Sequence, residues 1–160
     1  MDEMNETFLR RAIERAREAE SRGEVPIGAL IVSAEGDVLA EASNETIERC
    51  DPTAHAEILA IRAAGQKIGN YRLTGTSVYS TIEPCAMCAG ALVNARVARL
   101  VYGAPDERFG AVRSKFEICD SEILNHRIEI VTGVLEEECR KLMQDFFRSR
   151  RIKTENGVST

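Results

Sequence analysis

The sequence predicts an α/β domain in which helices cover both faces of a sheet. Helical patterns and short apolar runs alternate along the chain, and this alternation is typical of a sheet enclosed by helices. The chain has 160 residues, of which 44 % are hydrophobic and 29 % charged, enough for one core and a water-facing surface. Because no repeat or linker divides the sequence, residues 1–153 are expected to form one domain, followed by a frayed tail at 154–160.

The chain begins with an expected helix and a β-hairpin. Apolar residues recur at helical spacing between residues 5 and 20, and Gly23 supplies a stop signal. The apolar runs 27–32 and 38–42 are separated by the turn residues 35–37. This pattern predicts two paired strands.

Two further helices are expected in the middle of the chain. The first covers residues 53–64, with Thr53 as its N-terminal cap and Gly65 near its end. The second covers residues 85–96, with Pro84 in its first turn.

The remaining apolar runs predict three strands and a last helix. Strands are expected at 77–81, 100–102 and 128–134, with a long polar loop at 103–114. Strand–helix–strand units of this kind are parallel and right-handed. The apolar spacing from residue 135 to 146 predicts the final helix.

Composition limits the compartment and the partners. The N-terminal segment lacks the apolar stretch of a signal peptide, and no run is long enough to span a membrane, so we expect a cytoplasmic protein. Five cysteines, an odd number, argue against a disulfide framework. The net charge of −5 disfavours general nucleic-acid binding, unless a local basic patch provides it.

Two short segments carry the candidate chemistry, His55-Ala56-Glu57 and Pro84-Cys85-Ala86-Met87-Cys88. The first pattern is weak alone in a Glu-rich chain, whereas the second is stronger. Each segment is expected in the first turn of a helix, so the two helix N-termini can point at one spot. The positive end of a helix dipole also favours the thiolate form that binds zinc.

The number of ligands indicates a catalytic zinc site. His55, Cys85 and Cys88 provide three protein ligands, and catalytic zinc keeps three and leaves a fourth position for water. A carboxylate that does not bind the metal must then carry protons, and Glu57 is placed for that role.

Two other interpretations of these residues stay open at this stage. Cys50 lies five residues before His55 and could complete a closed structural zinc site. A Cys-x-x-Cys pair that opens a helix also suits a redox protein, although this leaves His55 and Glu57 without a role.

Both segments together resemble the cytidine-deaminase-like zinc enzymes. Over nearly the whole chain, the sequence is more specifically similar to the bacterial tRNA-specific adenosine deaminases. The resemblance is carried by the segments 51–58 and 83–91, which contain the two motifs, and by 23–29, 70–73, 102–104, 125–127 and the closing 145–148.

The resemblance implies a fold, a substrate and partners. The fold is a three-layer α/β/α sandwich with a five-stranded mixed sheet, forming a single CMP/dCMP-type deaminase domain. The reaction converts the wobble adenosine of a tRNA anticodon to inosine, in bacteria in the arginine tRNA, with one Zn²⁺ in each subunit of a homodimer. Asn44 and Ala56 are the implied substrate-binding residues, and Asp106 falls in the loop near the anticodon.

The sequence departs from the family pattern in that loop. The family often has Asp-x-Lys and then Gly-Ala-x-Gly-Ser, whereas this chain has Arg108 at the lysine and Arg113 at the second glycine. Arginine keeps a phosphate partner with different geometry. The lost glycine leaves the conformation of the loop open.

A basic stretch near the C-terminus is the candidate RNA surface. Residues 140–153 include six basic residues and one acidic residue, which gives this stretch a local net charge of +5. Phe147 is the better candidate for stacking on a base, because Phe146 falls on the apolar face. The candidate RNA contacts are Arg108, Phe147, Arg148, Arg150 and Arg151. The same residues could instead be only a solvated helix end.

Two rival functions remain. A deaminase of a free base or nucleoside, such as guanine or cytosine, would share the zinc site without needing a basic C-terminal helix. A zinc-binding RNA module without activity is the other, and the intact Glu57 argues against it.

Overall fold

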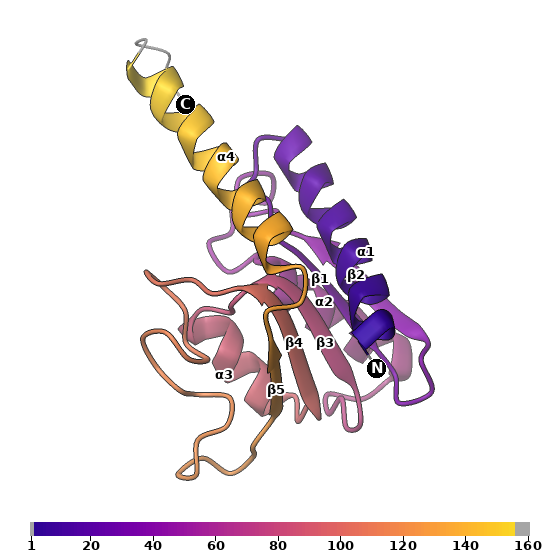
Figure 1. Cartoon of the computed structure of the whole chain (residues 1–160). Coiled ribbons are helices and arrows are strands. Elements are labelled where there is room, and N and C mark those ends of the chain that lie inside the picture. The colour runs from indigo at the N-terminus through magenta and orange to yellow at the C-terminus, as the bar shows by residue number, and fades with distance from the viewer. Residues whose placement is uncertain (1, 156–160) are drawn as a thin grey trace.

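A five-stranded mixed sheet forms the centre of the molecule, seen in a computed structural model that describes residues 2–155 (Figure 1). Its order is β2-β1-β3-β4-β5. β1 is antiparallel to β2 and β3, whereas β4 is parallel to both β3 and β5. The strands are β1 (Gly28–Val32), β2 (Val38–Ser43), β3 (Ser77–Ile82), β4 (Arg99–Ala104) and β5 (Glu129–Thr132).

Helices cover both faces of this sheet, which confirms the predicted three-layer α/β/α fold. One face carries α1 (Asp2–Ser21) and α4 (Glu136–Glu155), and the other carries α2 (Ala56–Ile68) and α3 (Ala86–Asn94). Within residues 2–155, no helix is both long and apolar enough to cross a membrane.

The inner strands bury side chains on both faces, so the core has two halves. Along β1, Ala29 and Ile31 pack with α2 and α3, while Leu30 and Val32 pack with α1. This explains why the run reads as continuously apolar. Gly28 lets α1 lie directly on the sheet, since a Cβ there would come within 2.0 Å of the backbone carbonyl oxygen of Ala12.

The second predicted helix is displaced toward the C-terminus. It begins at Ala56 instead of 53, because the Thr53 hydroxyl donates to Asp51 Oδ1 in a preceding turn and does not cap the helix. It continues past Gly65 and ends where Gly69 takes a left-handed conformation, with φ of 69°. The left-handed conformation is the usual helix stop and favours glycine.

The third predicted helix is also shorter than expected. It covers Ala86–Asn94 instead of 85–96, with Cys85 as its N-cap and Pro84 outside the helix. Pro84 is held outside the helix because its carbonyl oxygen accepts the Ala111 N–H at 2.9 Å. α4 includes Thr154 and Glu155, the first two residues of the expected tail, whereas 156–160 lie outside the described residues.

Candidate metal centre and active site

The imidazole of His55 and the thiols of Cys85 and Cys88 meet where α2 and α3 begin. His55 is the N-cap of α2 and Cys85 is the N-cap of α3, and neither side chain is used for capping. Both are therefore free to face a common point. His55 Nδ1 lies 3.6 Å from Cys85 Sγ and 3.5 Å from Cys88 Sγ.

These distances fit a tetrahedral metal ion. Zinc holds sulfur at about 2.3 Å and nitrogen at about 2.0 Å, so tetrahedral ligands lie about 3.6 Å apart. The three ligand atoms all lie within 4.8 Å of one another. The sequence-predicted ligands are thus brought together in a group that could hold a metal ion.

The two thiols of the cluster differ in their pKa. Two hydrogen bonds lower the pKa of Cys85 to about 4: the larger effect comes from Cys88 and a smaller one from His55. The pKa of Cys88 is raised, because it donates to Cys85 and is buried. A divalent cation between the sulfur atoms is the group that allows both to be thiolates.

Glu57 lies beside this cluster with a carboxylate oxygen that has no partner. The residue is only 2 % exposed, and its Oε1 has no hydrogen-bond partner among the described residues. Desolvation by burial raises its pKa to about 6. Because a buried polar atom is costly when it is unpaired, this oxygen indicates a further polar group in the site, and a metal with its water satisfies that need.

Cys50 is not part of the cluster. It is exposed, in a left-handed conformation with φ of 49°, and its thiol contacts the Ile47 carbonyl oxygen at 3.8 Å. Cys119 and Cys139 are buried in the two halves of the core. A closed structural site therefore lacks its fourth ligand in this arrangement.

Asn44 and Ala56 join the sheet to the start of α2. Asn44 Oδ1 accepts the Ala56 N–H at 3.0 Å, and both residues are buried. This contact fixes the first turn of α2, directly after His55. The N–H of Ala56 is thereby already engaged by Asn44.

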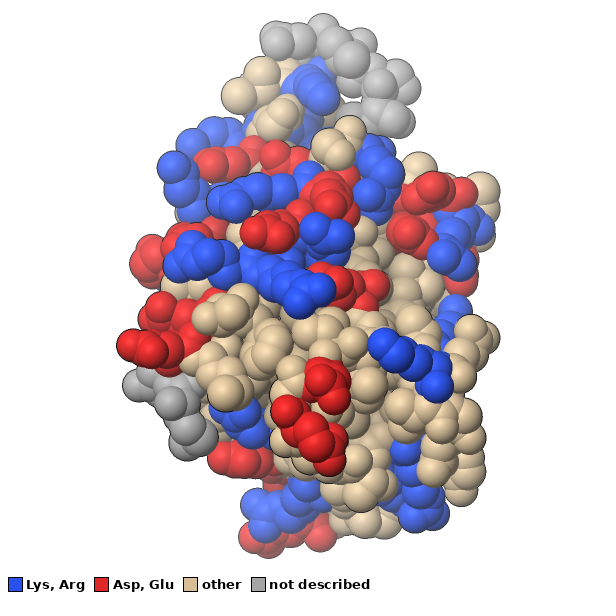
Figure 2. All heavy atoms as spheres, turned by 90° about the vertical axis from the view of Figure 1, so that its right-hand side faces the viewer, with Lys and Arg blue, Asp and Glu red and all other residues tan. Residues whose placement is uncertain are grey.

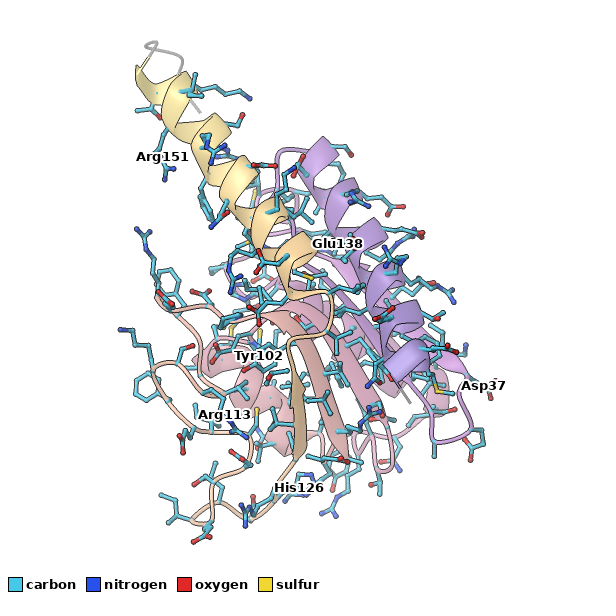
Figure 3. The ribbon with its side chains drawn as sticks, in the orientation of Figure 1. Asp37, Tyr102, Arg113, His126, Glu138 and Arg151 are labelled. Carbon is cyan, nitrogen blue, oxygen red and sulfur yellow. The ribbon has the colours of Figure 1, made fainter. Side chains whose placement is uncertain are left out.

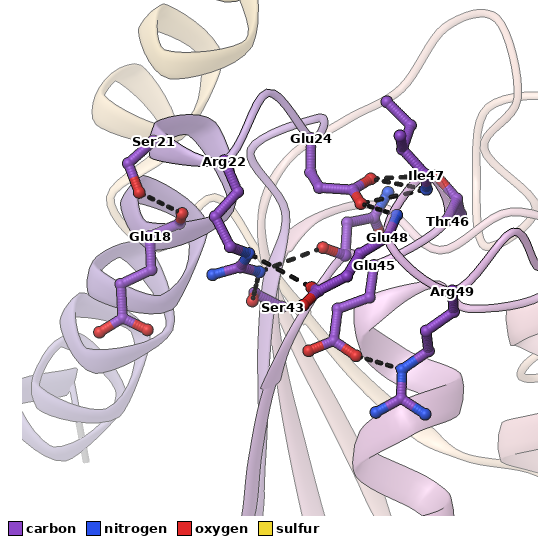
Figure 4. A network of polar contacts seen from close by, with 11 residues as sticks. Glu18, Ser21, Arg22, Glu24, Ser43, Glu45, Thr46, Ile47, Glu48 and Arg49 are labelled. Carbon is purple, nitrogen blue, oxygen red and sulfur yellow. Dashed lines mark hydrogen bonds and ion pairs between the residues drawn. The ribbon is translucent and has the colours of Figure 1, made fainter.

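Sequence reasoning missed two buried glutamates that hold loops beside the site. Glu24 accepts the N–H groups of Ile47 and Glu48 and the hydroxyl of Thr46, so it fixes the loop between β2 and α2 (Figure 4). Glu83 does the same for the loop after β4. The one sequence signal was that Glu83 directly precedes the Pro-Cys segment.

The loop after β4 lies directly against residues 84–88, which carry two of the candidate ligands and which we call the metal-ligand segment. Gly110 forms an isolated antiparallel bridge with Cys85. The carboxylate of Asp106 accepts the N–H groups of Arg108 and Phe109 and shapes the turn at the tip. Arg113 is not among the described residues with positive φ, so its backbone conformation does not require the glycine that the family often has there.

The candidate RNA contacts of α4 differ in exposure. Phe147 is 44 % exposed whereas Phe146 is buried, as expected. Arg150 stacks 4.7 Å from the centre of the Phe146 ring and donates to the Gly23 carbonyl oxygen, so it is engaged within the chain. Arg151 is exposed near the far end of α4, beyond the sheet (Figure 3), and Arg148 lies 3.8 Å from Asp145.

The charges of α1 form a mixed surface. On the side where α1 lies, basic and acidic side chains are intermingled (Figure 2). Arg11 pairs with Glu41 at 2.7 Å and Arg15 with Glu18 at 2.9 Å. This surface has no basic stripe of the kind that binds a nucleic-acid backbone.

Comparison with known proteins identifies the family. The family model for MafB19-like deaminases matches residues 3–151. The tRNA-specific adenosine deaminase of Haemophilus influenzae is 45 % identical over 93 % of this chain and 86 % of its own.

Two solved structures are also similar. One, from a study of A-to-I editing by tRNA:A34 deaminases at the wobble position of transfer RNA, has a TM-score of 0.82 and 43 % identity, over 85 % of this chain and 98 % of that chain. The guanine deaminase of Bacillus subtilis has a TM-score of 0.62 and 34 % identity, over 91 % and 92 %. The chain therefore belongs to the deaminase family that the MafB19-like model describes, together with the tRNA-specific adenosine deaminases.

Proposed function

We propose that the protein is a zinc-dependent hydrolytic deaminase that converts the wobble adenosine of a tRNA anticodon to inosine and releases ammonia. The bacterial substrate would be the arginine tRNA. The observation that carries the proposal is the cluster of His55, Cys85 and Cys88 with the buried, unpartnered carboxylate oxygen of Glu57 beside it. The identity of 45 % to a tRNA-specific adenosine deaminase supports the choice of substrate.

His55, Cys85 and Cys88 would hold Zn²⁺, since one imidazole and two thiolates suit zinc and their spacing fits its tetrahedral geometry. Bound there, zinc supplies a Lewis acid that makes water acidic enough to act as a nucleophile near neutral pH. Glu57 would accept one proton from the attacking water and deliver it to N1 of the adenine. It would then accept the second proton, from the hydroxyl group formed at C6, and deliver it to the amino group, which leaves as ammonia while C6 becomes a carbonyl. Burial of Glu57 supports this role, because its pKa of about 6 lets the carboxyl group both take and give a proton.

The substrate must enter the site as a flipped base, because C6 is not reachable inside the anticodon stack. Asn44 and Ala56 would form the wall beside His55, where their mutual hydrogen bond fixes the start of α2. Asp106 would contribute to substrate binding from the loop after β4, in which Gly110 forms a bridge with Cys85. We also propose that the working unit is a homodimer, which sedimentation equilibrium would report as twice the chain mass of 17.7 kDa.

The proposed activity is tested with a synthetic arginine-tRNA anticodon stem-loop. Zinc-loaded protein should convert the wobble adenosine alone, read as an A-to-G change after reverse transcription. The same stem-loop with guanosine at the wobble position should give no product. A folded, zinc-loaded sample that makes no inosine would contradict the proposal.

One observation favours a second candidate, a deaminase of small substrates. The chain is 34 % identical to the guanine deaminase of Bacillus subtilis over 91 % of its length, and the same three ligands would serve that reaction. Ammonia release from free guanine or cytosine, without conversion of the stem-loop, would select this function.

The exposed basic residues of α4 should make RNA binding sensitive to salt. We expect Arg151→Gln to weaken stem-loop binding and to reduce the slope of log K against log salt by about 0.7 to 0.9, because the variant neutralises one phosphate fewer. Fluorescence anisotropy at several salt concentrations measures both. Arg17→Gln removes the same charge from the exposed face of α1 and is the matched control. Equal affinities and slopes in the two variants would show that the end of α4 does not bind RNA.

A further inference from the structure

Glu83 is a buried carboxylate that the reaction proposed above does not use. Its side chain is only 1 % exposed, yet it lies directly before the metal-ligand segment. A carboxylate is seldom buried unless both of its oxygen atoms have hydrogen-bond or charged partners. The partners of this carboxylate therefore indicate what it does.

Among the described residues, every hydrogen-bond partner of the Glu83 carboxylate belongs to the loop after β4. Oε1 accepts the Asp106 N–H at 3.0 Å and the Ser114 hydroxyl at 2.5 Å. Oε2 accepts the N–H groups of Val112, Arg113 and Ser114 at 3.0, 2.9 and 2.9 Å. One carboxylate thus joins both ends of the segment 106–114, which we call the Glu83 loop.

The Glu83 loop is packed so closely on this carboxylate that it has little freedom. A Cβ on Gly110 would lie 2.3 Å from the Glu83 carboxyl carbon and 2.5 Å from the Asp106 carbonyl oxygen. The Ala111 N–H also donates to the Pro84 carbonyl oxygen at 2.9 Å. The position of the loop is therefore set relative to the backbone that carries Cys85.

The outer side of the Glu83 loop is turned to solvent. Phe109 is 67 % exposed and Arg108 is exposed beside it. An aromatic ring and a guanidinium group are the side chains that stack on bases and bind phosphates in single-stranded RNA. An internal anchor favours binding at such a tip. A loop that is already fixed loses less conformational entropy on binding RNA than a flexible loop does.

We propose that Glu83 is a positioning residue, which anchors the Glu83 loop against the metal-ligand segment so that Arg108 and Phe109 meet the anticodon nucleotides around the flipped base. The inference rests on the proposed function. Only a carboxylate suits this position, because both of its oxygen atoms accept hydrogen bonds. The NH₂ group of a glutamine would face N–H or O–H donors whichever way the amide turned.

The central experiment compares Glu83→Gln with Glu107→Gln. Glu107 is exposed in the same loop, so its substitution removes the same charge near the RNA without removing an anchor. We expect Glu83→Gln to keep its zinc and to lose about 100-fold in kcat/KM for the stem-loop, mostly through KM. Glu107→Gln should leave KM unchanged or lower it.

Two readouts separate positioning from a merely structural role. A destabilised protein loses active molecules, which lowers the apparent kcat and leaves KM unchanged, whereas a displaced loop raises KM. Trypsin should also cut Glu83→Gln faster than wild type after Arg108 and Arg113, and mass spectrometry assigns these cuts. Ser114→Ala, which removes the hydroxyl and leaves four N–H donors, should raise KM by a smaller factor of about 3 to 10.

The possible outcomes are distinct. Loss of zinc from Glu83→Gln, or a fall in kcat at constant KM, would overturn the proposal. If Glu83→Gln does not fold, an unchanged KM in Ser114→Ala would overturn it instead. If wild-type protein makes no inosine, the proposed function fails. Tryptic cutting tests the role of Glu83 independently, and equal rates in wild type and Glu83→Gln would show that Glu83 does not anchor the loop.

Discussion

Glu57→Gln is expected to keep its fold and its zinc and to lose nearly all deamination. One well-placed acid–base group typically contributes about 100- to 10,000-fold in rate, and here a single carboxylate would serve every proton transfer. Glutamine has almost the same shape, so the buried site is not emptied, but an amide cannot take the proton. Single-turnover conversion of the stem-loop measures the rate, and elemental analysis of the same sample measures the zinc.

The matched control for this substitution is Glu20→Gln, which changes an exposed glutamate of α1. It should retain the wild-type rate. A wild-type rate in Glu57→Gln would end the assignment of Glu57 as proton carrier. Loss of zinc from Glu57→Gln would instead make this residue part of the metal site, in conflict with a site formed by His55, Cys85 and Cys88 alone.

The cluster of His55, Cys85 and Cys88 could be predicted from the sequence because it depends on local geometry. Cys85 and Cys88 are three residues apart at a helix start, so they must share a face wherever that helix lies. His55 needed one further step, the expectation that a second helix begins nearby. The alternation of apolar runs and helices predicted the layers for the same reason, since each element must bury its apolar face.

The exact helix starts and the loop anchors could not be predicted, because distant or competing contacts decide them. Thr53 looked like a cap, but its hydroxyl is used by Asp51 in a turn. Glu83 bonds groups that lie 23 to 31 residues further along the chain. A glutamate is expected at the surface by its type, and only the fold shows that Glu24 and Glu83 are buried in addition to Glu57.

His55→Ala is expected to lose zinc, and the chain provides a close control. It has two histidines, and the other, His126, lies away from the cluster with its Nε2 2.7 Å from the Val97 carbonyl oxygen. Removing His55 leaves two thiols, which is one ligand fewer than catalytic zinc keeps. Because a bound ligand stabilises the folded state by mass action, a chelator should lower the melting temperature of wild type and of His126→Ala, but not that of His55→Ala.

Cys50→Ser completes this experiment, because it separates an open catalytic site from a closed structural one. A closed site would lose zinc when Cys50 is replaced, whereas a site of three protein ligands would keep the metal and its response to the chelator. Full zinc in His55→Ala, or zinc lost from Cys50→Ser, would contradict the three-ligand site. Zinc kept in Cys50→Ser and lost from His55→Ala would leave the fourth coordination position to water, which is the position that deamination requires.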